Sequence, residues 1–289
     1  MTDSEVKRVN CNSFCIAALV SLSLAVASLS FCVFQLNKKV DSFSSSVSFV
    51  KHKIHTVEKN QEAVYSFDSK EGFEEAVGKV LSRIDFQTQQ SALDRKYAKF
   101  SAAPLHVSGG THLYGEPNAR FSLIEFSDLE CIYCNRFHDT PQKVVDMNPT
   151  SVNLQWKNNP LSMHDPAAYT EAVAAECVAD QVGNRAFWAF VDDVFDQTRG
   201  NGRGLPNLET VAEGVGADLE AFHTCMTSNA VTPKVQADLQ SAKTYGINST
   251  PVTVAIDNTT GQMTQILGAV STKQVMSALQ NLAKSTGQQ

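Results

Sequence analysis

The hydrophobic pattern of the chain opens with one long apolar run near the N-terminus. Between Phe14 and Leu36 there is no charged residue, and Leu, Val, Ala and Phe fill most positions. At about 1.5 Å per residue, a helix of this length crosses a hydrocarbon layer of about 30 Å. The run therefore predicts an uncleaved signal anchor. A cleaved signal peptide is the alternative, because Ala25-Val26-Ala27 offers a small-x-small site, but cleavage there would leave an apolar mature end.

Apolar residues then recur at alternating intervals of four and three, which is the heptad pattern of a coiled coil. The positions are Leu36, Val40, Phe43, Val47, Val50, Ile54, Val57, Gln61 and Val64. We expect a stalk that self-associates as a dimer or trimer; a single amphipathic helix is the alternative. Asp68 and Glu71 next predict a capping box for a second helix. Its apolar face would consist of Phe73, Val77, Val80, Leu81 and Ile84.

Beyond a linker that contains Pro and Gly, the pattern alternates between short strands and helices. Strands are expected where β-favouring residues alternate or cluster, at 121–126, 152–156, 251–256 and 263–267. A helix is expected after Cys134, with a break near Asp139 and Thr140 because Pro141 follows. Further helices are predicted at 166–180, 187–195, 208–214, 218–228 and 235–245, and from a cap at Ser271 with Gln274.

Composition narrows the class of protein. A formal net charge of −6 without any Lys/Arg cluster excludes a nucleic-acid binder by charge. Four of the seven cysteines lie beyond the apolar run, an even number that two disulfides would use up: Cys131, Cys134, Cys177 and Cys225. An oxidising compartment is therefore expected. Four reduced thiols in a cytosolic protein are the alternative, against which the N-terminal run argues.

The clearest chemical motif is Cys131-Ile-Tyr-Cys134, directly after the strand at 121–126. Two cysteines separated by two residues lie one helical turn apart, so they can close a short disulfide. At the helix N-terminus, free N–H groups and the helix dipole would stabilise a thiolate on Cys131. Cys131 is then the nucleophile and Cys134 the resolving thiol. Asp128 and Glu130 would raise the pKa of Cys131, so the redox poise stays open.

Half of a zinc site is the alternative use of this cysteine pair. The sequence has no second CxxC, and Cys177, Cys225 and His138 do not fall at the usual ligand spacings. We therefore expect no metal and no bound cofactor.

Three motifs follow one another in an order that matters for the fold. They are Leu123-Ile-Glu-Phe-Ser-Asp before the dithiol, then Glu176-Cys-Val-Ala with Phe187-Trp188, and Tyr245-Gly-Ile-Asn-Ser-Thr-Pro251 before a strand. With the order of the elements, they resemble the DsbA-like family of exported thiol–disulfide oxidoreductases. The resemblance covers about residues 115 to 283. It implies an α/β thioredoxin fold with a helical insertion at about 162–245.

Four segments then make up the chain. Residues 1–36 form the tail and signal anchor, 37–100 the helical stalk, 101–114 the linker, and 115–289 the DsbA-like thioredoxin domain.

The resemblance suggests further site residues. Glu125 is expensive to bury in an apolar strand, so it is either outward-facing and inert or buried with a raised pKa. In the family, a buried acid at this place relays the proton of the second cysteine. Pro251 resembles the family's cis-proline, which faces the disulfide; a trans Pro that starts an edge strand is the alternative. Thr250 and Tyr133 would lie near the sulfurs and help to bind and release substrate.

Cys177 and Cys225 fall on expected helices of the insertion. Each alone is most often a buried thiol, but as a pair they make a structural disulfide that an exported domain can keep. His138 and His164 are expected at the solvent edge; the alternative is that either one tunes the thiolate.

The function that follows is a membrane-tethered oxidase or isomerase of protein disulfides. We expect a single-pass protein of a bacterial inner membrane with its catalytic domain in the periplasm. Its partners would be exported cysteine-containing proteins and a membrane redox partner, either a quinone-linked oxidase or a thiol reductase. The alternative is a non-enzymatic envelope assembly protein that uses a thioredoxin-like scaffold to bind partners.

Overall fold

The computed structural model describes residues 70–105, 107 and 110–285, and it divides the chain into two units between Arg83 and Ile84. The expected signal anchor at 14–36 and the heptad segment at 36–64 lie outside the described residues. Among the helices that are described, none combines the length and the apolar character of a membrane span.

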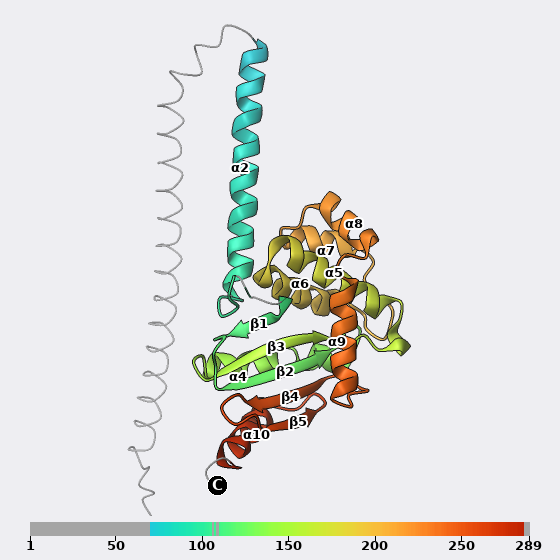
Figure 1. Ribbon diagram of the computed structural model, residues 1–289. Coiled ribbons are helices and arrows are strands. Elements are labelled where there is room, and N and C mark those ends of the chain that lie inside the picture. Colours follow the sequence, from blue (N-terminus) through green and yellow to red (C-terminus); the bar gives the residue numbers. More distant parts are fainter. Residues whose placement is uncertain (1–69, 106, 108–109, 286–289) are drawn as a thin grey trace, which may run out of the picture. The chain divides into compact units, whose positions relative to one another are not determined.

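The described part of the larger unit is built on a five-stranded mixed sheet in the order β1-β3-β2-β4-β5 (Figure 1). The strands are β1 His112–Gly115, β2 Phe121–Ser127, β3 Val152–Asn158, β4 Val252–Asp257 and β5 Met263–Leu267. Only β2 and β3 run parallel within this described sheet, and the helix pair between them supplies the crossover. The four strands expected from the sequence are confirmed. β1 was missed because four residues beside glycines give too short a pattern.

Alternation along β2 decides which side chains face which layer. Leu123 and Glu125 point toward the main apolar core, whereas Phe126 belongs to a smaller cluster on the opposite face. Helices α4 (Asp139–Met147) and α10 (Thr272–Ser285) contact the sheet on the side of the main core. Ala242 of α9 (Thr232–Thr244) packs in the smaller cluster. Both faces of β2 are therefore covered, which explains its almost uninterrupted burial.

The helical insertion between β3 and β4 begins with a short 3-10 helix, η2 (Ser162–His164). It continues through α5 (Ala167–Val182), α6 (Asn184–Gln197), α7 (Leu208–Gly214), α8 (Leu219–Ser228) and α9. A disulfide joins Cys177 on α5 to Cys225 on α8, with 5.8 Å between the two Cα atoms. The expected N-cap of α8 is confirmed, because the side chain of Asp218 accepts a hydrogen bond from the backbone N–H of Ala221.

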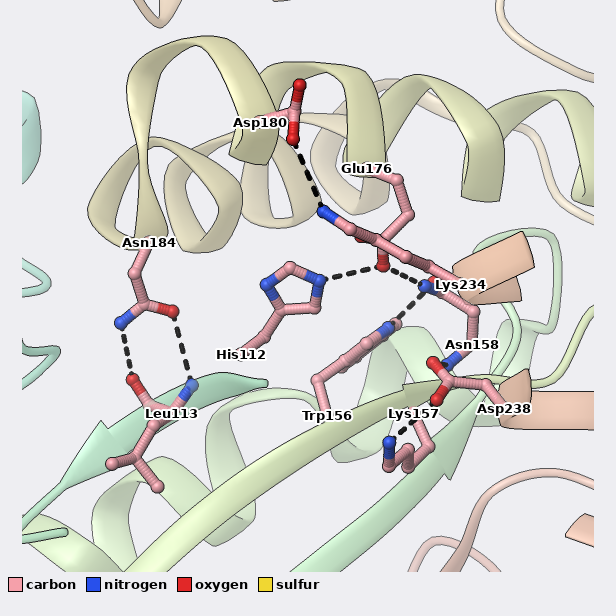
Figure 2. A network of polar contacts seen from close by, with 10 residues as sticks. All are labelled: His112, Leu113, Trp156, Lys157, Asn158, Glu176, Asp180, Asn184, Lys234 and Asp238. Atoms are coloured by element: carbon pink, nitrogen blue, oxygen red, sulfur yellow. Dashed lines mark hydrogen bonds and ion pairs between the residues drawn. The ribbon is translucent and has the colours of Figure 1, made fainter. Parts of the chain in front are cut away.

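A buried polar network fastens this insertion to the sheet (Figure 2). Oε1 of Glu176, on α5, lies 2.7 Å from Nε2 of His112 on β1 and accepts a hydrogen bond of 2.7 Å from the side-chain amide of Asn158 on β3. Asn158 in turn accepts from the indole N–H of Trp156. Nζ of Lys234 on α9 lies 3.8 Å from Oε2 of Glu176. Four elements from distant parts of the chain therefore meet around one buried carboxylate.

The helix α2 (Lys70–Ala98) contains the expected apolar face of the second helix and continues to Ala98. Its apolar residues remain 39% to 55% exposed at the five positions of the expected apolar face, Phe73, Val77, Val80, Leu81 and Ile84. Near its C-terminal end, in the larger unit, Lys96 pairs with Asp193 and the hydroxyl of Tyr97 donates to the carbonyl of Val215.

Candidate active site

The two thiols of the CxxC motif lie at the start of α3 (Ile132–Phe137), the helix that follows β2. Cys131 is the N-cap of this helix, with an extended backbone, and Cys134 lies one turn further along. Both are free thiols in the structure. Cys131 is 6% exposed, whereas Cys134 is fully buried beneath it and accepts a hydrogen bond of 3.4 Å from the backbone N–H of Asp128. The helix start thus presents one thiol and conceals the other.

The two thiols have opposite acidities. The pKa of Cys131 falls to about 5, because the Cys134 thiol donates a hydrogen bond to its thiolate. The hydroxyl of Thr250 and the N–H groups of Cys134 and Tyr133 add to this effect and outweigh the cost of burial. The pKa of Cys134 lies well above its ordinary value because of burial and the neighbouring Cys131. Near neutral pH the arrangement therefore holds one thiolate and one thiol.

Glu125 lies on the face of β2 that looks into the main core. It is 1% exposed, and its strand neighbours are Trp156 on β3 and Thr253 on β4. Burial raises the pKa of Glu125 to about 8. The sequence allowed either an outward-facing or a buried side chain for Glu125, and in the structure the side chain is buried.

Ser127 is a site residue that the sequence analysis missed. It lies two residues after Glu125 and therefore on the same face of the strand. Its buried hydroxyl makes no hydrogen bond of good geometry with a described residue, yet it lowers the pKa of both Glu125 and Cys134. The alternation of β2 was the signal that could have singled it out.

The Thr250–Pro251 peptide bond is cis, and the loop that carries it faces the dithiol. Sγ of Cys131 lies 3.5 Å from the carbonyl oxygen of Thr250. Tyr133 is exposed and, with Thr250 and Gly268, lines a surface cavity of about 480 Å³. All the residues of the expected catalytic and substrate-binding sets are thus brought to one region around the start of α3 and the end of β2.

The two acidic residues before Cys131 are bonded to groups other than its thiol. Asp128 is buried and accepts hydrogen bonds from the backbone N–H groups of Glu130 and Leu161. Its Oδ2 also lies 2.7 Å from Nδ1 of His164. The carboxylate of Glu130 is directed to the loop at 198–204, where it accepts from Thr198 and Gly204. Neither carboxylate prevents the low pKa of Cys131.

The expectation that His138 and His164 lie at the solvent edge is wrong. They are 4% and 6% exposed. Nε2 of His138 lies 3.4 Å from Asp192, and its ring packs at 5.0 Å from that of Phe195. Contacts with partners far away in the sequence bury both rings, and no local pattern reveals such partners.

The fold and the dithiol together define a thioredoxin-fold protein with a thiol redox centre. Among the described residues, no group of three or more His, Cys, Asp or Glu side chains is arranged to hold a metal ion. A family model described as thioredoxin matches residues 107–277, more than half of the chain, so the chain belongs to the thioredoxin family, in its DsbA-like branch.

The crystal structure of DsbA2 from Pseudomonas aeruginosa is 34% identical to this chain, and the alignment covers 60% of this chain and 95% of that one with a TM-score of 0.55. BdbD from Bacillus subtilis is 17% identical over 63% of this chain and 98% of its own, with a TM-score of 0.53, which shows the fold alone. These similarities confirm the DsbA-like resemblance and the thioredoxin fold with a helical insertion.

A curated relative is a Na(+)/H(+) antiporter NhaA 1 from Mycolicibacterium gilvum, 28% identical over 142 residues. The match takes up 48% of this chain and 22% of the relative, so the chain spans about a fifth of the length of the curated relative it matches.

Proposed function

We propose that this protein is a thiol–disulfide oxidoreductase that exchanges disulfides with exported cysteine-containing proteins. In the oxidised protein, a substrate thiolate attacks Sγ of Cys131, a new S–S bond forms, and the bond between Cys131 and Cys134 breaks. Cys134 leaves as a thiolate and takes up a proton. A second substrate thiolate then attacks the substrate sulfur of the mixed disulfide, and Cys131 leaves as a thiolate. The substrate gains a disulfide, and two electrons pass to the dithiol.

The observation that carries this proposal is the unequal placement of the two thiols. Cys131 caps α3 beside the carbonyl of Thr250, and Cys134 is buried one turn later. A substrate can therefore reach only Cys131, whereas Cys134 can reach the mixed disulfide from within. The low pKa of Cys131 also makes it a good leaving group in the second step.

The remaining residues have supporting roles in this proposal. Glu125 exchanges the proton that Cys134 needs when it leaves or attacks, and the hydroxyl of Ser127 stabilises the charged form of each. Thr250, Pro251 and Tyr133 hold the substrate chain beside Cys131, as the carbonyl and the cavity at this loop suggest. The disulfide between Cys177 and Cys225 is structural and does not take part in exchange.

The direction of exchange that we favour is oxidation or isomerisation of substrate disulfides. A stabilised thiolate on Cys131 favours the reduced dithiol, so the disulfide form is a stronger oxidant than one with an ordinary thiol. An oxidase would be reoxidised by a quinone-linked membrane partner. An isomerase would be kept reduced by a thiol reductase.

The location that we propose is a bacterial inner membrane, with the redox domain at 115–289 on the periplasmic side. The apolar run at 14–36 supports the anchor, and the heptads at 36–64 support a homo-oligomeric stalk within residues 37–100. The expected linker at 101–114 ends in the sheet, because residues 112–114 belong to β1.

Trapping of mixed disulfides in the full-length chain tests the function. A Cys134→Ser variant should accumulate covalent adducts with exported proteins that a reductant releases, because the resolving thiol is missing. Cys131→Ser is the matched control and should trap none. A reduction potential as low as that of thioredoxin, together with failure to refold a protein with scrambled disulfides, would show that both proposed directions are wrong.

A further inference from the structure

A second cavity, of about 210 Å³, opens beside Cys131 on the side of the helical insertion. One wall belongs to α3 and includes Arg136, and the other is the loop at 198–204, which contributes Thr198, Arg199 and Gly200. This loop comes from the insertion, about seventy residues after the dithiol in the sequence. The reactive thiol thus lies between two cavities, because Arg136 also lines the cavity that contains Tyr133 and Thr250.

The wall of the insertion is held firmly in place by Glu130, the residue before the reactive thiol. Its carboxylate accepts hydrogen bonds from the hydroxyl of Thr198 and, at 3.1 Å, from the backbone N–H of Gly204. Its carbonyl accepts a further bond of 2.6 Å from the N–H of Asn201. Glu171 keeps a raised pKa of about 8 through burial and the nearby Glu130, and it accepts from the backbone N–H of Leu205. The loop therefore has a defined position relative to Cys131.

The cavity is positively charged. Both lining arginines, Arg136 and Arg199, are exposed and form no ion pair with any described residue. Asp196, near the end of α6 and just before this loop, is exposed as well and forms no ion pair with either arginine. Glu130 is fully buried with its oxygens directed to the loop backbone and Thr198. Among the described residues, none that lines the cavity carries a carboxylate.

We propose that this cavity binds an Asp or Glu side chain of the substrate, close in sequence to the cysteine that reacts with Cys131. The inference rests on the proposed exchange function and names its substrate class. Guanidinium groups bind carboxylates through paired hydrogen bonds, and two of them border one small cavity here. The chain as a whole carries a net charge of −6 and repels acidic partners. The two arginines provide local positive charge beside the thiol, in contrast to the net negative charge of the chain.

Matched peptides test this proposal. The oxidised full-length chain is mixed with reduced two-cysteine peptides that differ only in one residue near the first cysteine, which is Glu, Gln or Lys. The rate of reduction of the bond between Cys131 and Cys134 is divided by each peptide's rate with hydroxyethyl disulfide, so that differences in thiol reactivity cancel. The Glu peptide should react about fivefold faster than the Gln peptide, and added salt should reduce the difference.

Variants separate the cavity from the overall charge. Arg199→Gln and Arg136→Gln should each lower the ratio of the rate with the Glu peptide to the rate with the Gln peptide. Arg95→Gln, at an exposed position of α2 outside both cavities, makes the same change of charge and should keep the preference.

Two results would overturn the inference in different ways. Efficient exchange with equal rates for the Glu and Gln peptides would show that the cavity does not bind a carboxylate. A loss of the preference for Glu in Arg95→Gln as large as in the two cavity variants would show the same. A lack of exchange with every peptide would overturn the proposed function itself, and this inference with it.

Discussion

At the scale of single residues, the site works through unequal environments for chemically similar groups. Cys131 and Cys134 are the same residue type three positions apart, yet the first has a pKa of about 5 and the second a strongly raised one. The hydrogen bond that the Cys134 thiol donates lowers the pKa of Cys131, and burial raises the pKa of Cys134. Glu125 is held neutral by the same core that buries Cys134.

Replacement of Cys134 should therefore change the acidity of Cys131. In the reduced chain, the alkylation rate of Cys131 should follow a titration with its midpoint near pH 5. In Cys134→Ala the donated hydrogen bond is lost, so the midpoint should rise by at least about one unit. Alkylation rates across a pH series measure this. An unchanged midpoint would assign the low pKa to the helix and Thr250 alone.

Replacement of Glu125 should change how stability depends on pH. The pKa of Glu125 is raised from about 4.3 in an unfolded chain to about 8 in the folded one, so the folded state binds this proton more tightly. Its contribution is complete below about pH 4, decreases as the pH rises, and is lost by about pH 8. Glu125→Gln removes this loss and should stabilise the protein by an amount on the order of 3 kcal/mol at pH 7.

Denaturant unfolding at pH 4, 7 and 8.5 tests this expectation, with the stability of each variant expressed as its difference from the original chain at the same pH. Glu213→Gln, at an exposed position of α7, is the control and should change stability little at any of them. A Glu125→Gln variant that gains nothing between pH 4 and 8.5 would show that the carboxyl is not held neutral.

At the scale of elements, local pattern predicted most of the helices and strands. The expected strand at 121–126 is β2, and the expected helix at 208–214 is α7 with the same bounds. The cap at Ser271 is also confirmed, since Ser271 and Gln274 exchange hydrogen bonds. What the pattern missed depends on long-range contacts: the edge strand β1, which pairs with β3, and the loop at 198–204, which is positioned by Glu130.

The loop at 198–204 depends on a glycine at one close approach. Gly200 has a φ of +67°, and a Cβ added there would lie 2.8 Å from Cγ2 of Ile132 and 3.2 Å from the carbonyl oxygen of Glu130. Gly200→Ala should therefore destabilise the protein by more than the roughly 1 kcal/mol of a left-handed alanine, and it should slow exchange because the wall beside Cys131 moves.

Gly246→Ala is the matched control for this change. Its φ is +69°, almost the same, but no atom of the described residues lies within 4 Å of an added Cβ. The difference in unfolding free energy between the two variants isolates the contact with α3. Equal values, with equal exchange rates, would show that the close approach of the loop to Ile132 does not matter.

At the scale of the whole molecule, the site lies where the thioredoxin core and the helical insertion meet. β2 and α3 supply the dithiol, the loop before β4 supplies Thr250, and the insertion supplies the wall with Arg199. The sequence identified the first two because their motifs are local and ordered as in the DsbA-like family. The third was not predictable, because the hydrogen bonds between Glu130 and the loop join residues about seventy positions apart.

The insertion itself should depend on its disulfide. The bond between Cys177 and Cys225 closes a loop with a sequence separation of 48, and in the chain-entropy description a loop of this size stabilises the folded state by about 4 kcal/mol. Cys177→Ala combined with Cys225→Ala should therefore lower the unfolding free energy by about that amount. The pKa of Cys131 should not change, because its causes are the hydrogen bonds at the start of α3.

Denaturant unfolding of the double variant and of the original chain, each with and without a reductant, measures the effect. In the reductant, which also keeps Cys131 and Cys134 reduced in both chains, the original chain should come close to the double variant. If the original chain keeps its stability in the reductant although both cysteines become alkylatable, the packing of α5 against α8 holds the insertion without the bond. The buried network around Glu176 would then be the main interaction that holds the insertion on the sheet.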